Sequence, residues 1–382
     1  MNTYRAWDKL ERRPGDDDGI VDFDVVPDYD NPLSFDSRKQ VAGAIEELLD
    51  RAPHTGDYAE FSAAKLQASR MHLHLLDRRK VPLRKHAQTA MGVTPEKVDE
   101  EVIDDYRARL DDQLKEHGMR FDREYEDALV VREEPVELAK RLVGLTKTAK
   151  AVTSPFIPDN AAPAIRPKLV SKDEEWVGAA GTDAHGNLYV KINLHPRHKH
   201  TIARLAAIVV HEMQGHIAQF SLWQGKIRAA EMDPAMGITT MHTPENTQAE
   251  FNAQAIEQIG LLALAAADPE EGWKYEFQAG YNDLFAMVSH NAHLKLNSAY
   301  PESVVASYAA DRLPFTSREN IEKSVLSGRE DPMLRGYLAC YEPAMAAARL
   351  LLAQPVKKQK AVLHETFSQP MTLPQIEALI TG

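Results

Sequence analysis

The chain has 382 residues, which is long enough to bury a large core as one big domain or as two of ordinary size. Its 57 Asp and Glu residues outnumber 45 Lys and Arg, and the formal charge of -12 argues against nucleic acid or an anionic membrane as the main partner. A small molecule or a peptide fits this charge better. Residues 1–19 are charged where a signal peptide needs an apolar core, and no apolar run approaches the roughly 18 residues of a membrane span. Because Cys340 is the single cysteine, no intrachain disulfide can form, and we expect a cytoplasmic protein.

The first part of the chain is predicted to be helical after an irregular start. Residues 1–35 are acidic and rich in turn-forming residues, and we expect an irregular arm there. Between residues 36 and 155, apolar side chains recur at three- and four-residue intervals, as in amphipathic helices that bury one face. The helices expected in this N-terminal region cover 37–51, 59–79, 95–118 and 135–151.

Residues 156–382 are predicted to contain one small sheet followed by more helices. Apolar and polar side chains alternate in LYVKINLH (188–195), which predicts a strand paired with 168–177 across a turn at 181–186. The helices expected after it begin near Thr201 and cover 246–267, 272–296, 301–311, 317–326 and 332–354. We therefore predict a mainly α fold with one small β-sheet edge, in which this region forms one continuous domain with 36–155.

The clearest chemical motif is HEMQGH at residues 211–216. On a regular helix, side chains five apart diverge by about 140°, whereas the usual zinc helix has its two histidines four apart. An extra residue accommodated as a π-bulge cancels most of this offset, and Gly215 eases irregular backbone. We therefore predict that His211 and His216 bind one metal ion only if the helix is locally widened or ends there. The alternative is that two core histidines flank a glutamate by chance.

A third ligand is expected downstream. A peptidase-type zinc site needs three protein ligands and an open position for water. Glu250 and Glu257 stand seven residues apart in the helical stretch 248–258, so both lie on nearly the same face. Either one can complete a His-His-Glu set, although helices routinely carry glutamates without any such role.

These residues resemble the HExxxH branch of the helical gluzincin metallopeptidases. HEMQGH matches the His-Glu-x-x-Gly-His of dipeptidyl peptidase III, and the microtubule-associated tyrosine carboxypeptidases use the same five-residue spacing. The sequence is more similar to a large bacterial family of unassigned function, whose hallmarks are His-Glu-x-x-Pro-Gly-His-x-x-Gln and Glu-Gly-Trp-Ala-x-Tyr-x-Glu.

HEMQGHIAQ (211–219) and EFNAQAIE (250–257) keep much of both hallmarks but lack the proline and the Gly-Trp pair. The resemblance covers roughly 185–350 and implies a multi-helix, zincin-like metallopeptidase fold. Its register implies that Glu250 is the third ligand and that Glu257 is a supporting or structural carboxylate.

Two further stretches agree with the resemblance. In zinc peptidases an edge strand beside the motif helix holds extended substrate by backbone pairing, and residues 189–195 lie in the right place in the chain to supply one. RGYLACYEPA (335–344) resembles the bacterial family's Tyr-x-x-Gly stretch, with Cys340 where glycine is usual. Tyr337 and Tyr341 are thus candidates to hydrogen-bond a developing oxyanion, the alternative being that they only pack.

Histidines elsewhere are weaker candidates. His290 and His293 lie three apart on one predicted helical face, which suits a role in substrate binding or transition-state stabilisation. The alternative is a polar core pair that caps neighbouring helices. HPRHKH at 195–200 is expected to be a solvated loop, and a second metal site there is disfavoured because such a loop is mobile.

With His211, His216 and Glu250 on zinc, a water at the fourth position would have a pKa near neutrality. Glu212, next in sequence to a ligand, would act as the general base, and the reaction expected is hydrolysis of an amide bond in a peptide or peptide-like small molecule. Two histidines and a carboxylate also form the triad of non-haem iron oxygenases, so iron is the alternative metal, but that chemistry gives Glu212 no evident task. The third possibility is a helical binding protein without catalysis.

Overall fold

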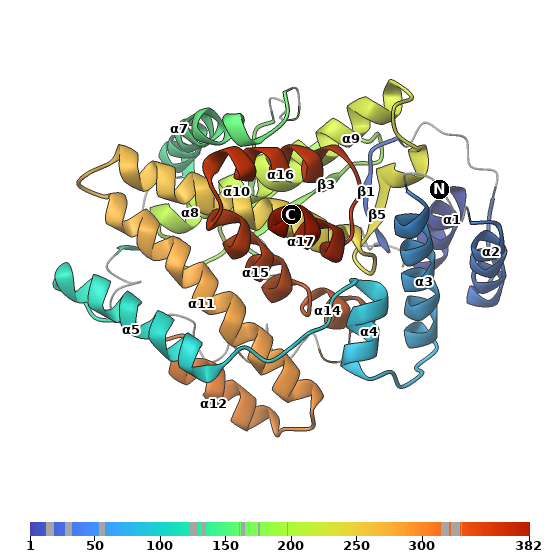
Figure 1. Cartoon of the computed structure of the whole chain (residues 1–382), viewed down its shortest axis with the longest axis horizontal. Coiled ribbons are helices and arrows are strands. Elements are labelled where there is room, and N and C mark those ends of the chain that lie inside the picture. The colour runs from blue at the N-terminus through green and yellow to red at the C-terminus, as the bar shows by residue number, and fades with distance from the viewer. Residues whose placement is uncertain are drawn as a thin grey trace.

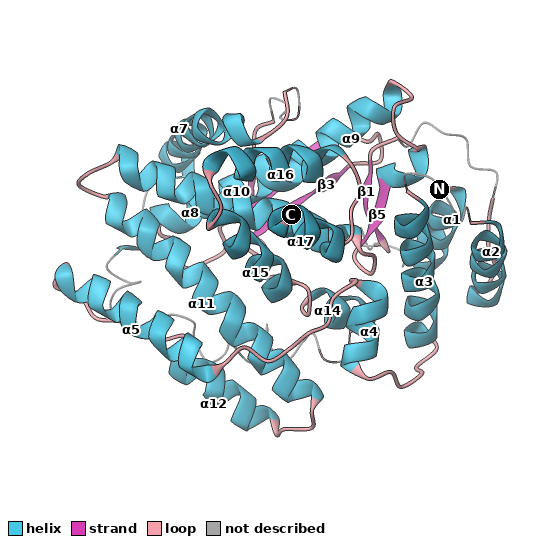
Figure 2. Ribbon diagram, viewed as in Figure 1, coloured by secondary structure: helices cyan, strands magenta, loops and turns pink. Residues whose placement is uncertain are grey.

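The computed structural model describes residues 1–382 apart from 13–18, 27–32, 53–57, 123–128, 132–134, 160, 162–164, 175, 197, 315–320, 322–328 and 330. The protein is mainly helical, as predicted for the fold class, and it contains two small β-sheets; β1 and β5 lie between the helices α1–α3 and the rest of the helical body (Figures 1 and 2). Among the described residues, no helix combines the length and the apolar character that crossing a bilayer requires.

The N-terminal elements are α1 (Asn2–Glu11), β1 (Val21–Asp24), α2 (Arg38–Arg51), α3 (Ala59–Leu76), α4 (Leu83–Ala90), α5 (Glu100–Glu116) and α7 (Pro135–Thr153). The prediction of an irregular arm over 1–35 is wrong for its described part, which contains a helix and a strand. Tyr4 and Trp7 explain the difference, because they are fully or almost fully buried and pack with apolar side chains of α2 and α3. The prediction gave weight to the acidic turns and overlooked these two aromatic anchors.

Two other details of this region differ from the prediction. Helix α5 begins at Glu100 rather than at residue 95, because the Asp99 carboxylate accepts the backbone N–H of Glu101 and caps the helix there. Helix α4 was not predicted. It is short, and its buried side chains, among them His86, pack against α3 and α14.

The β-structure forms two separate sheets. Strands β2 (Lys168–Val170), β4 (Leu188–Asn193) and β3 (Gly178–Thr182) lie in that order, with β2 parallel and β3 antiparallel to the central strand. Strand β1 pairs with β5 (Ile238–Thr240) in the second sheet. The predicted strand at 188–195 is confirmed as β4, and part of 168–177 does pair with it as β2, but this pairing is parallel and the hairpin partner across the turn is β3. Because β4 is the central strand, it cannot be the free edge that we expected it to supply.

The helix that carries residues 211–216 is continuous over 202–228 and changes its geometry in the middle. It consists of α8 (Ile202–Val209), a π-helical segment η2 (Val210–Ile217) and α9 (Ala218–Arg228). Its start is confirmed, since the Thr201 hydroxyl accepts the N–H of Arg204 at 3.1 Å and caps the first turn. The run of apolar residues before His211 is buried, so the motif is held inside the body of the protein.

Helix α10 (Glu245–Ala267) crosses this motif helix and is almost entirely buried, with η2, α11 and α15 packed around it. The remaining elements are α11 (Gly272–Asn297), α12 (Glu302–Arg312), α14 (Pro332–Tyr337), α15 (Tyr341–Leu352), α16 (Val356–Ser368) and α17 (Leu373–Thr381), with short 3₁₀ turns η1 (Ser154–Phe156) and η3 (Pro234–Gly237). The predicted helix 332–354 is interrupted at 338–340, α16 and α17 were not predicted, and the predicted helix 317–326 lies mostly outside the described residues.

Candidate metal centre

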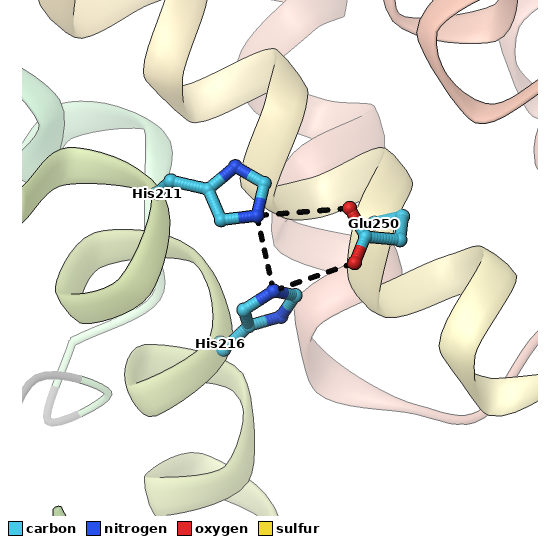
Figure 3. Close-up of side chains that lie close together, drawn as sticks. All are labelled: His211, His216 and Glu250. Carbon is cyan, nitrogen blue, oxygen red and sulfur yellow. Dashed lines mark hydrogen bonds and ion pairs between the residues drawn. The ribbon is translucent and has the colours of Figure 1, made fainter. Parts of the chain in front are cut away.

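The π-helical segment brings the two motif histidines together. Its wider turn places residues five apart on one face, and the Nε2 atoms of His211 and His216 lie 3.2 Å from each other (Figure 3). The predicted local widening of the helix is therefore confirmed.

Gly215 allows the motif helix to approach α10 closely. A Cβ atom at this position would lie 2.5 Å from both the Cα and the Cβ of Ala253, which is far inside van der Waals contact. The sequence analysis assigned this glycine to backbone flexibility, but its φ is not in the left-handed region and the close helix contact is what requires it. The consequence is that His216 faces the turn of α10 that carries Glu250.

Glu250 completes the group of three donors. Its Oε2 lies 3.6 Å from the His211 Nε2 and its Oε1 lies 3.7 Å from the His216 Nε2 (Figure 3). Ligand atoms at 2.0–2.2 Å from a tetrahedral zinc ion are separated by roughly 3.3–3.6 Å, so the spacing of these donors fits a zinc ion. The carboxylate is buried, whereas the two imidazoles keep a small exposed fraction, 16% and 12%.

Glu257 supports His211 from the opposite side of the ring. Its Oε2 lies 2.9 Å from the His211 Nδ1, and its Oε1 accepts the Asn282 side-chain N–H at 2.5 Å. A donor bond from Nδ1 leaves Nε2 of a neutral ring with a free lone pair for a metal. Glu250 thus lies with the two histidines in the candidate metal-binding group, whereas Glu257 bonds the Nδ1 of His211 on the far side of the ring. Asn282 was not identified from the sequence, because nothing local marks which residue of α11 faces α10.

Glu250 and Glu257 also raise the pKa of His211. Burial alone would lower the pKa of this histidine, but the hydrogen bond to Glu257 and the charges of Glu250 and Glu257 raise the pKa to about 10. Burial, together with the neighbouring His211, holds the pKa of His216 well below its usual value. A metal ion that binds here must displace the proton from His211, so metal uptake releases a proton at neutral pH.

Glu212 lies at the inner wall of the sheet rather than among the three donors. A Cβ on Gly178 of β3 would lie 2.8 Å from the Glu212 Oε1, so only a glycine leaves room for this carboxylate. Burial raises the pKa of Glu212 to about 7, with His211 acting in the opposite direction. Gly178 was missed by the sequence analysis, although a glycine within a strand is a signal for close approach of another group.

The two predicted tyrosines reach the centre. The Tyr337 hydroxyl donates to the Glu250 Oε1 at 2.6 Å, and the Tyr341 hydroxyl donates to the Tyr337 oxygen at 3.0 Å. Burial, followed by the charge of Glu250, raises the pKa of both phenols well above the usual value. Both therefore stay protonated at neutral pH and remain hydrogen-bond donors.

The other predicted histidines serve the packing of the helices. The Nε2 of His290 donates to the Glu96 carbonyl at 2.9 Å, and the Nε2 of His293 donates to the Arg335 carbonyl at 3.0 Å. Within the described part of the chain, no contact joins either ring to the three metal donors. The alternative reading, a polar core pair that holds neighbouring segments, describes what these two residues do.

The loop at 195–200 shows no convergence of imidazoles among its described residues. The His200 Nε2 pairs with the Asn193 carbonyl at 2.7 Å, and the His198 Nε2 pairs with the Glu174 carbonyl at 2.8 Å. His200 is buried, so the expectation of a wholly solvated loop is wrong at that position. Among the described residues, the search for three convergent metal-binding side chains finds His211, His216 and Glu250.

The fold and the site define a mainly α protein with a candidate His-His-Glu metal centre. No protein-family model and no curated protein matches the chain. Among solved structures it is similar to "the putative lipoprotein from Colwellia psychrerythraea", with a TM-score of 0.57 and 15% identity. That likeness covers 90% of this chain and 59% of the other, so the chain spans about three fifths of that longer protein. At this identity the likeness concerns the fold alone.

Proposed function

We propose that the protein is a zinc-dependent hydrolase that cleaves an amide bond of a peptide or a peptide-like small molecule. The observation that carries this proposal is the convergence of His211, His216 and Glu250 with separations suited to one tetrahedral ion. A bound zinc ion would supply an activated water near neutral pH and would polarise the substrate carbonyl. Family membership among the HExxxH gluzincins is part of the same proposal and is supported by the motif and by its π-helical geometry.

Glu212 is proposed as the general base. It is adjacent in sequence to His211, its carboxylate lies beside Gly178 of β3, and it interacts electrostatically with His211 and Glu250 without belonging to the group of three candidate ligands, so it could act as a proton acceptor next to a bound metal. In the metal-free protein, burial raises the pKa of Glu212 to about 7. The unprotonated form accepts the proton, and the same group can then donate it to the leaving amine.

Strand β3 is proposed to hold the substrate backbone. The Asn193 N–H donates to the Val177 carbonyl, and the Asp183 N–H donates to the Asn187 carbonyl, which fixes the residues of β3 that bond to β4. In an antiparallel ladder these alternate, so the backbone groups of Gly178 and Ala180 point away from β4. They lie at the free edge next to Glu212, where an extended peptide can pair with them.

Tyr337 is proposed to act on the carbonyl group of the substrate. In the present structure its hydroxyl donates to Glu250, and Tyr341 supports it. A protonated phenol so close to the three donors can also donate to an oxyanion that develops on the substrate carbonyl. The structure gives no comparable reason to retain His290 or His293 in the reaction.

The cellular location of the protein is a separate proposal. The single, buried Cys340 fits the reducing cytoplasm, whereas the name of the structural neighbour, a lipoprotein, would place a similar protein at a membrane surface. We propose the cytoplasm. Cell fractionation, with an antibody to detect the protein, distinguishes a cytoplasmic from a membrane location. Recovery in the membrane fraction would overturn the assignment.

Metal analysis of protein purified without added ions tests the proposed function. Stoichiometric zinc, together with peptide hydrolysis that stops on chelation and returns with zinc, is the expected result. Iron with substrate-dependent oxygen consumption would instead identify an oxygenase built on the same three donors. If the protein holds no metal and added zinc changes neither melting nor activity, the chain is a binding protein and the proposal is wrong.

A further inference from the structure

Among the described residues, no strand pairs with the outer edge of β3, and β1 lies against the end of that edge. Strand β1 lies against the end of β3, where the Asp24 N–H donates to the Thr182 Oγ1 at 2.8 Å. The Asp22 carbonyl oxygen is only 3.4 Å from the position that a Cβ on Gly181 would take. Gly181 is buried beneath both the Tyr189 ring of β4 and the Asp22 carbonyl of β1, whereas Gly178 keeps part of its surface exposed. A peptide paired with β3 therefore meets β1 before it reaches the end of the strand.

Strand β1 is fixed in this position from three directions. The Arg5 guanidinium of α1 bonds both carboxylate oxygens of Asp24, at 2.6 and 2.8 Å. The Gln224 side-chain amide of α9 donates to the Val25 carbonyl at 2.8 Å and to the Gly186 carbonyl at 3.0 Å, which ties the end of β1 to the β3–β4 turn. On its other side β1 pairs with β5. Moving β1 aside would break all of these contacts at once.

The covered edge limits how much peptide fits on one side of the bond that is cleaved. Gly178 is the residue next to Glu212, and Thr182 lies four residues further on, so at about 3.4 Å per residue only roughly 13 Å of edge separates the reacting centre from β1. Antiparallel pairing is the more stable of the two directions, and it points the amino end of a substrate toward Thr182.

We propose that β1 closes the substrate groove, so that the enzyme removes about one to three residues from the amino end of a peptide instead of cutting within a chain. This proposal rests on the proposed function, since it concerns the same centre. The substrate class is thus peptides with an accessible amino end. Strand β1, held by Arg5 of α1, and the edge strand β3 together would select for such substrates.

The test uses the zinc-loaded full chain with three forms of one ten-residue peptide: linear, extended at its amino end by a folded protein domain, and cyclised through its backbone. Mass spectrometry of the products over time is expected to show short pieces lost from the amino end of the linear form only. Cleavage of the cyclic form, or loss of residues from the carboxyl end alone, would overturn the proposal while leaving the hydrolase assignment intact. Failure to cleave any of the three forms would overturn both.

A variant that loosens β1 gives a second measurement. Thr182→Val removes the hydroxyl that accepts the Asp24 N–H and keeps the size of the side chain, while the contacts of β1 with Arg5, Gln224 and β5 remain, so we expect a rise of about twofold in the share of released pieces longer than three residues. Thr148→Val is the matched control, because that hydroxyl only bonds a carbonyl of its own helix α7. An unchanged product pattern in Thr182→Val, with the control also unchanged, would count against β1 as the limit.

Discussion

The contact between Gly215 and Ala253 leads to a prediction in which two physical effects have opposite signs. In an ordinary helix, replacing glycine by alanine stabilises the fold by roughly 0.5–1 kcal/mol, because glycine loses more backbone entropy on folding. At Gly215 the added Cβ would lie 2.5 Å from Ala253, whereas carbon atoms in contact are about 3.5–4.0 Å apart. The motif helix and α10 would have to separate by about 1 Å. Such overpacking costs roughly 1–3 kcal/mol, so Gly215→Ala is expected to destabilise the protein.

The same separation should weaken metal binding. His216 follows Gly215 directly, and Glu250 precedes Ala253 by one helical turn, so the 3.7 Å between their donor atoms would grow by a similar amount. Ligand distances are tolerant to only about 0.2 Å, and we expect zinc affinity to fall by about tenfold or more. Urea unfolding of the metal-free protein and competition with a chelating dye measure the two effects separately.

Gly225→Ala is the control, because it lies in α9 of the same continuous helix and a Cβ there meets nothing within 4 Å. It should stabilise the protein slightly and leave zinc affinity unchanged. If Gly215→Ala behaves like this control in both assays, the close approach of the two helices is not what holds the metal donors together, and the reasoning above fails.

Three further predictions concern single side chains. Glu212→Gln should retain stoichiometric zinc and lose turnover by roughly 10²–10⁴-fold, and wild-type kcat in a zinc-loaded sample would remove this residue from the mechanism. Glu257→Gln should weaken zinc binding about 10–100-fold, because the His211 ring loses the negatively charged partner of its Nδ1. Asn282→Ala should have a zinc affinity between those of Glu257→Gln and the wild type. Equal affinities of the three proteins in a dye-competition assay would contradict this prediction. The third prediction concerns the stability of the protein at low pH. Burial lowers the pKa of His72 and of His86 to about 3, so below pH 6.5 the unfolded chain binds protons that the folded chain does not. The free energy of unfolding should therefore fall as the pH drops from 6.5 toward 3, by about 1 kcal/mol per pH unit for each histidine, and His72→Phe should reduce that slope; a slope that the variant leaves unchanged in urea titrations would count against it.

Much of the helical part of the fold was accessible from the sequence. The periodic apolar pattern located α2, α3, α10, α11 and α12 to within a few residues, since one face of each must be buried. Predictions failed where a long-range contact outweighs local composition. Tyr4 and Trp7 are buried and hold an acidic segment against the core. The hairpin partner of β4 is β3, the strand whose Gly178 can lie against Glu212 and Ile208.

The chemistry of the centre was determined by the sequence to a large extent. The spacing of His211 and His216 demanded a distorted helix, and the residue types at 211, 212, 216 and 250 define a donor set with an adjacent carboxylate. Only the tertiary structure showed that Glu250 lies beside both motif histidines while Glu257 pairs with the far nitrogen of His211, that Tyr337 bonds Glu250, and that His290 and His293 bond backbone carbonyls. The physical reason is that periodicity along a helix tells which residues share a face, whereas the packing of one helix on another, here through Gly215 and Ala253, determines which turn of that face meets its partner.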